Sequence, residues 1–485
     1  LVPKVLSKIN PIIVPTATAA TSSVLSLKAL PIGDGLCFLL YKSLFEAFFL
    51  KGDRLDNTTL LRDRMMGMIS YYQGAKDDMF PSSYMMVPNI ETGRLNQITQ
   101  REAYDQGNFV ISVKMSDYQF KKYEEIRIEE RKLDTSNRKK AVTGKGSDSF
   151  SSYYRVFSRC YGNFVFPEGL ERPIPGNSKL NIEDAEDVEG FEEEEESTKL
   201  SALKIRRRED YIAKKREVMS DLDRNKLRYL SLDGVGDDRL AKFSPKYAEI
   251  IKHLATCPGN AFVYSQFREM EGIGIFSKAL EANGYAPFVI HQNPISGDWE
   301  IMYSNPSDVD KPKFCFYTGW ESNEVKEITK TIFNNELEKL PESLRAQILA
   351  INKEGNLRGE IIKVFLATSS AAEGITLCNV RQVHIMEPYW NPVRTEQVIG
   401  RAVRIGSHSN LPLVDRKVNI YSYVSSMTPT QLKDSFTIRN KDQSMTSDEY
   451  LYSISEKKRA IMQGIIQLFK EASIDCTLNS SDNEP

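Results

Sequence analysis

The chain has 485 residues and is 41% hydrophobic, which is enough for two or three domains with buried cores. Its formal net charge of −2 excludes a global basic field, so any contact with nucleic acid has to come from local patches. The six cysteines and four histidines are scattered without a C-x-x-C pair, which argues against a zinc site or a disulfide framework and favours a reducing compartment. The most apolar early stretch, 36–50, is broken by Lys42 and Glu46 and is too short to span a bilayer.

The first half of the chain is expected to combine helices, a strand and polar loops. Residues 36–75 have a helical pattern, and FVISVK at 109–114 alternates as a strand does. Ser116 is a suitable N-cap for a helix that runs to about Arg131, because its hydroxyl can accept a backbone N–H of the first turn. Residues 133–152 are expected to form a loop.

A block of negative charge is followed by a block of positive charge. Ten of the fourteen residues in 183–196 are acidic, and such a run repels itself and is expected to be disordered. Seven of the thirteen residues in 204–216 are cationic, and this segment is expected to be a helix. Two interpretations stay open: the two blocks partly neutralise each other, or the basic helix is a phosphate-contacting arm that the acidic tract gates.

From residue 240 onward the pattern is that of an α/β domain. Ser244 is expected to cap a helix that has Pro245 in its first turn and a core-facing stripe that begins at Tyr247. Short apolar strands then alternate with helical segments, which favours a parallel sheet covered on both faces. The expected strands are 261–264, 286–290, 313–318, 361–368, 381–386 and 417–424. A final helix is expected after Ser447.

The most informative segment is the helix expected from Pro392 to Ile405. Asn391 can cap its start, and Gly406 is placed to end it. Three polar side chains at i, i+4 and i+7 then share one face of the helix: Gln397, Arg401 and Arg404. Gly400 lies beside them, and the missing side chain there would let another backbone approach closely.

Two arginines at this spacing suit phosphoryl transfer. A guanidinium is always charged, and its fork of donors matches the oxygens of a phosphate. In nucleotide hydrolases such an arginine is worth roughly 10³ to 10⁵ in turnover. The alternative is a pair of surface arginines on a solvated helix, and the pattern Q-x-x-G-R-x-x-R alone leaves it open.

The residues upstream favour the phosphate interpretation. The loop 368–377 (TSSAAEGITL) follows an apolar strand directly, and α/β sheets bind ligands at the carboxyl ends of their strands. Within this loop, Glu373 also has a simpler interpretation as a cap or a surface carboxylate. Trp390, which follows the next strand, is either a packing residue or a platform for a base.

Three adjoining segments resemble motifs V and VI of superfamily 2 helicases: AAEGITL (371–377), HIMEPYWNP (384–392) and QVIGRAVRIGSH (397–408). The nearest likeness is to the helicase-like transcription ATPases of large nucleocytoplasmic DNA viruses, the poxvirus and asfarvirus type. The Swi/Snf translocases are a more distant likeness. FVYSQF (262–267) is similar to motif IV, and weaker likenesses extend the resemblance over roughly 60–485.

The resemblance implies a fold and roles for individual residues. Arg401 and Arg404 would reach the γ-phosphate of ATP, and Gln397 would couple that site to the interdomain cleft. The residues that would serve the nucleotide are Glu373, Gly374 and Gly400. The residues that would lie near the nucleic-acid backbone are Ser265, Gln266, Thr368 and Ser369, where contacts carry no sequence specificity. No metal ligand is implied in this chain.

The implied fold is α/β, a RecA-like doubly wound parallel sheet preceded by a mainly helical interdomain or insert region. We expect five parts. They are 1–60, a candidate remnant of a first RecA-like domain; 61–180, the interdomain region; 181–239, the acidic tract and basic helix; 240–430, the second RecA-like helicase C-terminal domain; and 431–485, a helical tail.

A complete motor also needs a phosphate-cradling loop, G-x-x-x-x-G-K-[ST], and carboxylates for magnesium. The sequence contains no such loop, and the segment 144–147 (GKGS) lacks a first glycine at the right spacing. Asp448 and Glu449 are expected to start the tail helix rather than to hold magnesium. ATP and Mg²⁺ would therefore be bound mainly by a domain that is not present here. The chain alone is expected to bind ATP weakly or not at all and to show no ATPase activity.

Two functional hypotheses follow. In the first, the chain is the C-terminal portion of a viral ATP-dependent helicase or translocase that acts in transcription. In the second, it is a truncated factor that binds nucleic acid or polymerase without hydrolysis. The resemblance implies DNA as a partner, with RNA as the alternative, together with the missing N-terminal RecA-like domain and viral RNA polymerase, but no membrane. It also implies a place in the virion and the host cytoplasm.

Overall fold

The computed structural model describes residues 42–52, 54–66, 68–70, 80–89, 94–99, 102–103, 110–142, 155–173, 202–234, 236–369, 374–434 and 444–474. The acidic tract 183–196 and the candidate remnant up to residue 41 lie outside the described residues, as do Glu373 and the segment 144–147. The chain divides into two compact units. The larger consists of 80–388 and 401–451, and the smaller consists of 1–79, 389–400 and 452–485.

The larger unit is built on a sheet of nine strands among the described residues. Eight of them follow the order β4-β3-β13-β12-β6-β11-β10-β7, and β5 pairs with the end of β13. All these pairings are parallel except β3 with β4. The strands are β3 (Ser82–Pro88), β4 (Leu95–Thr99), β5 (Ile111–Lys114), β6 (Asn260–Tyr264), β7 (Ala286–Pro287), β10 (Lys313–Tyr317), β11 (Val364–Ala367), β12 (Val380–Ile385) and β13 (Lys417–Ser426).

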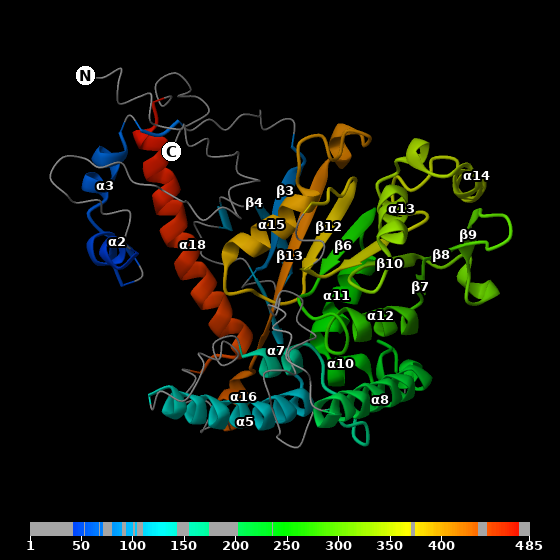
Figure 1. Cartoon of the computed structure of the whole chain (residues 1–485), viewed down its shortest axis with the longest axis horizontal. Helices are drawn as coiled ribbons and strands as arrows, with labels where there is room; N and C mark the ends of the chain where they lie inside the picture. The colour runs from blue at the N-terminus through cyan, green and yellow to red at the C-terminus, as the bar shows by residue number, and fades with distance from the viewer. Residues whose placement is uncertain are drawn as a thin grey trace. The chain divides into compact units, whose positions relative to one another are not determined.

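Different helices cover the two faces of the central strands. Ala261 and Val263 of β6 pack in one cluster with α11 (Pro245–Ala255) and α12 (Ile273–Ala282). On the other face, the ring of Phe365 lies 6.2 Å from that of Phe262 and 4.9 Å from that of Phe333, at the end of α13 (Asn323–Phe333). Successive side chains of a strand point to opposite faces, so these contacts place helices on both sides of the sheet. The predicted doubly wound, largely parallel α/β fold is confirmed (Figure 1).

Further elements surround this sheet in the larger unit. An antiparallel hairpin of β8 (Val289–Gln292) and β9 (Trp299–Met302) follows β7. The remaining helices are α5 (Asp117–Val142), α7 (Val156–Asn163), α8 (Ala202–Arg224), α9 (Lys226–Tyr229), α10 (Leu240–Phe243), α14 (Glu342–Ile351) and α16 (Pro429–Asp434). Short 3-10 turns lie at η3 (Pro306–Asp308), η4 (Leu337–Lys339) and η6 (Leu413–Asp415).

The predicted helix starts are confirmed, but two helix ends are not. Ser244 accepts the backbone N–H of Tyr247 at 3.0 Å and caps α11, and Ser116 accepts that of Gln119 at 3.0 Å at the start of α5. Helix α5 then continues to Val142, so the prediction of a loop from 133 is wrong for 133–142. Polar residues can continue a helix as well as form a loop, and Leu133, Ala141 and the three basic residues 138–140 have good helix propensity.

The helix that carries the arginines is shorter than predicted. Helix α15 (Pro392–Ala402) ends four residues before Gly406, which has a φ of +69°. The prediction that the helix runs to Ile405 is therefore wrong. Helices α15 and α18 (Ser447–Ala472) each contribute residues to both units.

Strands β3 and β4 are the main elements that the sequence did not indicate. Residues 82–85 of β3 pair in parallel with 417–420 of β13, more than 300 residues away in the chain. The segment assigned to the interdomain region thus contains helices and also supplies three strands to the sheet. The domain boundaries that we expect stay a prediction.

The smaller unit has its own hydrophobic core. Its elements are α2 (Lys42–Phe49), β1 (Leu50–Lys51), β2 (Arg54–Leu55), α3 (Thr58–Met65), the part of α15 up to Gly400 and most of α18. Phe49, Leu61 and Met65 are buried against Leu468 and Phe469 of α18. The end of the candidate remnant therefore shares a core with the tail helix. No helix among the described residues combines the length and the apolarity that crossing a bilayer requires.

Candidate functional site

Arg401 and Arg404 converge on one backbone carbonyl in the larger unit. Arg401, in the last turn of α15, donates from Nη1 to the Ile375 carbonyl oxygen at 3.3 Å. Arg404, two residues beyond the helix, donates to the same oxygen at 3.2 Å and also to the Thr376 hydroxyl. The two guanidinium groups that the sequence singled out are thus brought together on the segment 374–379, although Arg404 lies outside the helix that was expected to carry it.

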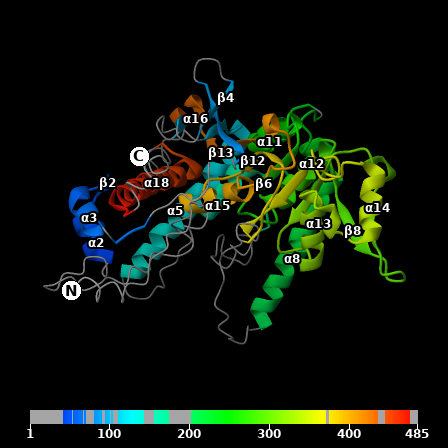
Figure 2. The same ribbon diagram turned by 90° about the horizontal axis from the view of Figure 1, so that it is seen from above.

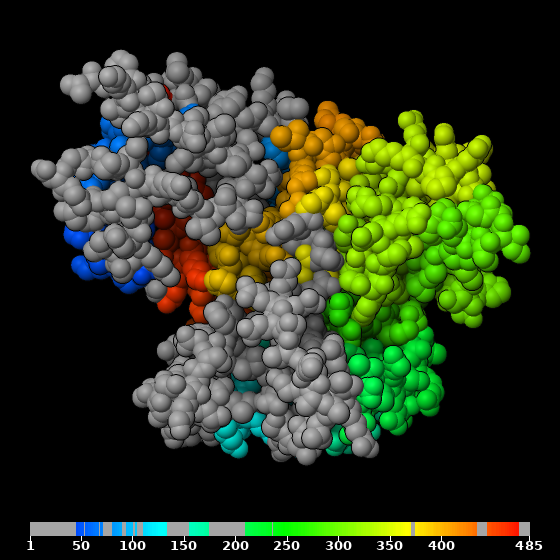
Figure 3. Space-filling view, viewed as in Figure 1, coloured from blue at the N-terminus to red at the C-terminus, as the bar shows by residue number. Residues whose placement is uncertain are grey.

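The segment 374–379 leads directly into β12, and backbone hydrogen bonds hold it to the end of α15 and the residues after it. Leu377 N–H donates to the Arg401 carbonyl at 2.9 Å, and Asn379 N–H donates to the Ser407 carbonyl at 3.0 Å. His408 Nε2 lies 2.7 Å from the carbonyl oxygen of Val380, the first residue of β12. Because these bonds tie 375–380 to 401–408, motifs V and VI form one structural piece. Figure 3 shows the orange segment after α15 at the molecular surface.

This arrangement can attract an anion. Each guanidinium carries five N–H donors and a permanent charge, and here both groups donate to the same neutral carbonyl oxygen. Two guanidinium groups that converge on one oxygen atom repel each other, and a phosphate oxygen bound by both would reduce that repulsion. The Arg401 side chain is 7% exposed, so such a phosphate would be bound largely away from water.

A second cluster joins the carboxyl ends of β6 and β12. Ser265 donates from its hydroxyl to Glu387 Oε1 at 3.0 Å, and the backbone N–H of Gln266 donates to the same carboxylate oxygen. Asn163 Nδ2 donates to Glu387 Oε2 at 3.1 Å. Ser265 is fully buried and Gln266 is 3% exposed. Neither side chain is accessible to a nucleic-acid backbone in this structure, because both serve the interior.

Arg159 completes the polar interior near Glu387. Its Nη2 donates to Gln266 Oε1 at 3.1 Å and to the Pro388 carbonyl at 2.9 Å. Burial raises the pKa of Glu387, while the Arg159 guanidinium and the hydrogen bond from Gln266 N–H act in the opposite direction. The sequence analysis assigned no role to Arg159 or Glu387. Their partners lie more than 100 residues away in the chain, and no sequence motif connects residues that far apart.

An ion pair joins α11 to the first turn of α18. Lys246 Nζ lies 2.7 Å from Asp448 Oδ2, and both side chains are 1% exposed. Lys246 also donates to Asn163 Oδ1 at 2.8 Å, and Ser425 N–H donates to Asp448 Oδ2 at 3.0 Å. Asp448 therefore starts the tail helix, as predicted, and its carboxylate is committed to a buried lysine.

The remaining predicted residues are dispersed. Thr368 is buried at the carboxyl end of β11, with Ser369 half-buried after it, and Gly374 is exposed with a φ of +79°. Gln397 is half-buried on α15. A Cβ placed on Gly400 would meet no atom within 4 Å among the described residues, so the close backbone approach expected there is not observed. Glu373 lies outside the described residues, and its interpretation stays open.

Trp390 belongs to the smaller unit and faces a cation. Lys458 Nζ of α18 lies 3.7 Å from the centroid of the Trp390 ring. Nearby in the same unit, Arg459 Nη1 lies 2.7 Å from Glu456 Oε1, and Arg459 Nε lies 3.6 Å from Glu396 Oε1. One face of the indole is thus covered by the tail helix, which favours the packing interpretation of Trp390 over a base-stacking platform.

The basic helix is present as α8, but its role stays open. Residues Val218 and Met219 pack against the hydrophobic core, and Leu222 is fully buried in it. Lys215 pairs with Glu269, while Lys214 and Arg216 are exposed. In Figure 2 the first turns of α8 extend beyond the other helices of the larger unit.

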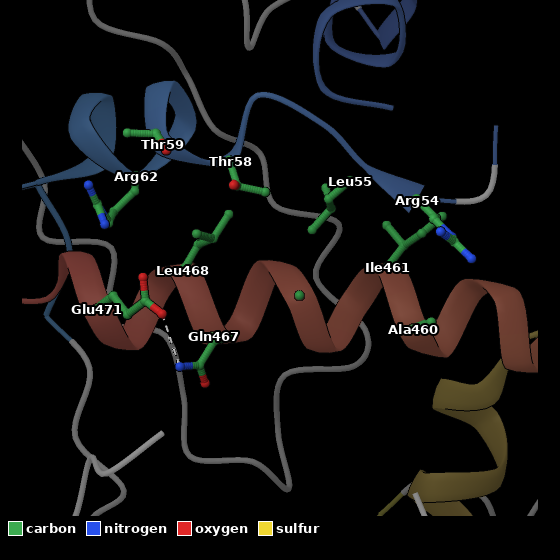
Figure 4. Close-up of a pocket in the computed structure, with 11 residues that line it drawn as sticks. Arg54, Leu55, Thr58, Thr59, Arg62, Ala460, Ile461, Gln467, Leu468 and Glu471 are labelled. Carbon is green, nitrogen blue, oxygen red and sulfur yellow. Dashed lines mark hydrogen bonds between the residues drawn. The ribbon is translucent and has the colours of Figure 1, made fainter. Parts of the chain in front are cut away.

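A cavity with a volume of about 380 Å³ lies in the smaller unit. Figure 4 shows it between α18 and the segment of β2 and α3: Leu55 lies across from Ile461 and Leu468 of α18, with Arg54 towards one end and Arg62 and Glu471 towards the other. It contains none of the predicted site residues. The described residues also include no group of three or more His, Cys, Asp or Glu side chains that could hold a metal ion.

Comparisons with known proteins agree with the motifs. Residues 329–406 match the family described as the helicase conserved C-terminal domain. A protein of Acanthamoeba polyphaga mimivirus that bears the name of an ATP-dependent RNA helicase is 28% identical over 457 residues, which cover 87% of this chain and 47% of that protein. The termination factor NPH-I homolog of African swine fever virus is 29% identical over 250 residues, which cover 49% of this chain and 33% of that protein.

Among solved structures, the C-terminal part of the Fun30 ATPase domain aligns with 75% of this chain and 96% of its own, at 13% identity and a TM-score of 0.32, too low to support structural equivalence. The chain spans about half the length of the mimivirus relative and a third of the African swine fever virus relative. The resemblance to viral superfamily 2 helicases is confirmed by the family match and by these viral relatives.

Proposed function

We propose that this chain supplies motifs IV to VI, with the arginines Arg401 and Arg404, to an ATP-dependent superfamily 2 helicase or translocase that acts on DNA in viral transcription. The observation that carries the proposal is the convergence of both guanidinium groups on the Ile375 carbonyl. The phosphate loop and the magnesium ligands come from a first RecA-like domain. The match of 329–406 to the helicase C-terminal family supports this assignment of the two halves.

The chemistry follows from charge. Hydrolysis of ATP concentrates negative charge on the γ-phosphate oxygens in the transition state, and a guanidinium at hydrogen-bond distance stabilises that charge. Arg401 and Arg404 would exchange the Ile375 carbonyl for phosphate oxygens when the first domain presents its nucleotide. In this proposal Gly374 and Glu373 would contact the nucleotide.

Contact with nucleic acid is proposed at the carboxyl edge of the sheet. Ser369 follows β11 there and is half-buried, and hydroxyl and backbone N–H groups bind phosphate without reading the base sequence. Thr368 is fully buried, so it would have to become exposed before it could join such a contact. Ser265 and Gln266 would have to leave the Glu387 carboxylate before they could join such a contact. The proposed preference for DNA rests on the resemblance to viral transcription ATPases, and the African swine fever virus relative bears the name of a termination factor.

The experiment begins with the coding sequence upstream of Leu1. If it encodes an in-frame G-x-x-x-x-G-K-[ST], the complete reading frame is assayed for DNA-stimulated phosphate release. Arg404→Ala is then expected to lower kcat by about 10³-fold, the lower end of the range for such arginines. The matched control is Arg345→Ala, an exposed arginine on α14 that should leave kcat unchanged. Equal turnover in Arg404→Ala and the control would refute the proposal.

If no phosphate loop is encoded upstream, the chain is assayed alone. Absence of turnover together with salt-sensitive DNA binding would support the second candidate, a non-hydrolysing transcription factor. The absence of G-x-x-x-x-G-K-[ST] from the sequence favours this candidate over a self-sufficient enzyme. Robust turnover of the chain alone that Arg404→Ala abolishes would contradict the assignment of Arg401 and Arg404 to one half of a divided site.

A further inference from the structure

Asn334 binds the segment 374–379 through two hydrogen bonds of its own. It follows α13 directly and is 4% exposed. Its Nδ2 donates to the Thr376 carbonyl at 2.9 Å, and its Oδ1 accepts the Cys378 N–H at 2.9 Å. One carboxamide thus satisfies both a carbonyl and an N–H of the segment, as a neighbouring strand would, and sets the position of Thr376.

Asn334 is itself held rigidly. The carbonyl of Phe333, the preceding residue, accepts Asn356 Nδ2 at 3.1 Å and Asn260 Nδ2 at 3.3 Å. The Phe333 ring is fully buried and lies 4.9 Å from that of Phe365 in β11. The carboxamide of Asn334 therefore projects from a point that is fixed to the start of β6 and to the centre of the sheet.

The contacts of Asn334 continue to the arginines through two residues. Thr376, whose carbonyl Asn334 binds, presents its hydroxyl to Arg404. Ile375, the preceding residue, presents the carbonyl that both Arg401 and Arg404 share. A shift of the Thr376 backbone would move both of these acceptors, and with them both guanidinium groups.

We propose that Asn334 is a positioning residue for Arg401 and Arg404: its two-point hydrogen bond to 376–378 keeps the arginines in the geometry that a γ-phosphate requires. The relevance to turnover rests on the function proposed above, whereas the positioning itself does not. A displacement of about 1 Å remote from the chemistry can cost roughly 10²-fold in rate, so a clamp of this kind matters even though Asn334 touches no substrate.

The first experiment tests positioning in this chain alone. A dicarbonyl reagent modifies accessible arginines, and mass spectrometry compares Arg404 with Arg224, a reference whose side chain is 72% exposed. Asn334→Leu keeps the number and branching of the side-chain heavy atoms but removes both hydrogen bonds, and it is expected to raise the Arg404-to-Arg224 ratio by about threefold or more. The control Asn323→Leu lies on an exposed position of the same helix and should leave the ratio unchanged. Equal ratios in the two variants overturn the proposal.

Asn334→Asp distinguishes the loss of the Asn334 hydrogen bonds from a general loss of stability. An ionised carboxylate still accepts the Cys378 N–H but repels the Thr376 carbonyl, whereas a protonated carboxyl can donate to that carbonyl as the amide does. Burial raises the pKa of such a carboxyl. The Arg404 ratio in Asn334→Asp is therefore expected to fall towards the wild-type value between pH 8.5 and pH 5.5, while Asn334→Leu stays high throughout. A ratio in Asn334→Asp that does not change with pH overturns the clamp.

The second experiment measures turnover in the complete reading frame, if that frame encodes a phosphate loop. Asn334→Leu is expected to lower kcat by roughly 10- to 100-fold with little change in the KM for ATP, because the arginines act mainly on the transition state. If Arg404→Ala lowers kcat but Asn334→Leu does not, positioning is refuted and the proposed function stands. If neither variant lowers kcat, the proposed function is refuted, and the labelling result still decides whether Asn334 positions the arginines.

Discussion

The buried pair of Lys246 and Asp448 offers the sharpest test of the structure in the larger unit. Its charges are 2.7 Å apart and 1% exposed, so water contributes almost nothing to their solvation. Removal of one partner from such a pair costs about 3–5 kcal/mol, because the other charge is left buried without compensation. Lys246→Met removes the positive charge of the pair, and Asp448→Asn removes the negative charge.

The surroundings set the expected size of each effect. After Asp448→Asn, Lys246 keeps the Asn163 oxygen at 2.8 Å and can use the introduced amide oxygen, so we expect a loss of about 3 kcal/mol. After Lys246→Met, the Asp448 carboxylate keeps the Ser425 N–H at 3.0 Å, and its Oδ1 has no partner among the described residues. We expect that variant to lose about 5 kcal/mol. The double variant buries no charge and should lose only about 4 kcal/mol, which is a coupling energy of about 4 kcal/mol.

The assay is equilibrium unfolding in urea, followed by tryptophan fluorescence in a Trp390→Phe background. The chain has three tryptophans, and the two that remain, Trp299 and Trp320, lie in the larger unit. The control cycle uses Arg224 and Asp221, whose side chains are 72% and 34% exposed at 3.1 Å. That exposed pair should show a coupling below about 1 kcal/mol. A coupling for Lys246 and Asp448 as small as that of the control would refute the buried ion pair.

Three further predictions test other parts of the structure. Burial holds the pKa of His384 well below its ordinary value of 6.5, so the unfolded chain binds a proton there before the folded one does. The free energy of unfolding should therefore fall as the pH drops below 6.5, and His384 contributes at most about 1.4 kcal/mol per pH unit to that slope. In His384→Gln this contribution is lost, so the urea midpoint should depend less on pH between pH 5 and pH 6.5. Gly272→Ala should lower the free energy of unfolding by roughly 3 kcal/mol or more, because the Cβ of the alanine would lie 1.8 Å from the Phe267 carbonyl oxygen. An unchanged melting temperature in this variant would contradict the backbone conformation at Gly272. Gly400→Ala should instead stabilise by about 0.5–1 kcal/mol in calorimetry, because the position is helical and open; a loss of kcat in that variant would show that the nucleotide needs the space.

Local features were predictable because their causes are local. Ser244 and Ser116 cap helices because a hydroxyl three residues before a free N–H is sufficient, whatever the rest of the chain does. The fully buried strands β6 and β11 stand out as apolar runs because both of their faces are covered. The prediction placed the end of α15 too late because it took Gly406 as the residue that ends the helix. In the structure the Ser407 hydroxyl accepts the Arg404 N–H and donates to the Ala402 carbonyl, so these two backbone groups are hydrogen-bonded outside the helix.

The site was predictable only in part. Arg401 and Arg404 were identified by spacing and resemblance, and the structure brings them onto one carbonyl. Ser265 and Gln266 were expected at a nucleic-acid surface, but both are buried against Glu387. Their partner Glu387 lies more than 120 residues further along the chain, and no local sequence pattern indicates the contact.

By itself, the sequence determined the alternation of strands and helices after residue 240, the starts of α5, α11 and α18, and the identity of the two arginines. Those properties depend on hydrophobic period, capping chemistry and residue type. Only the tertiary structure decided that β3 joins β13, that Asp448 neutralises Lys246, and that Asn334 clamps the segment carrying the acceptors of both arginines. Each of these is a contact between residues more than 40 positions apart, and its existence depends on how the whole sheet brings distant segments together.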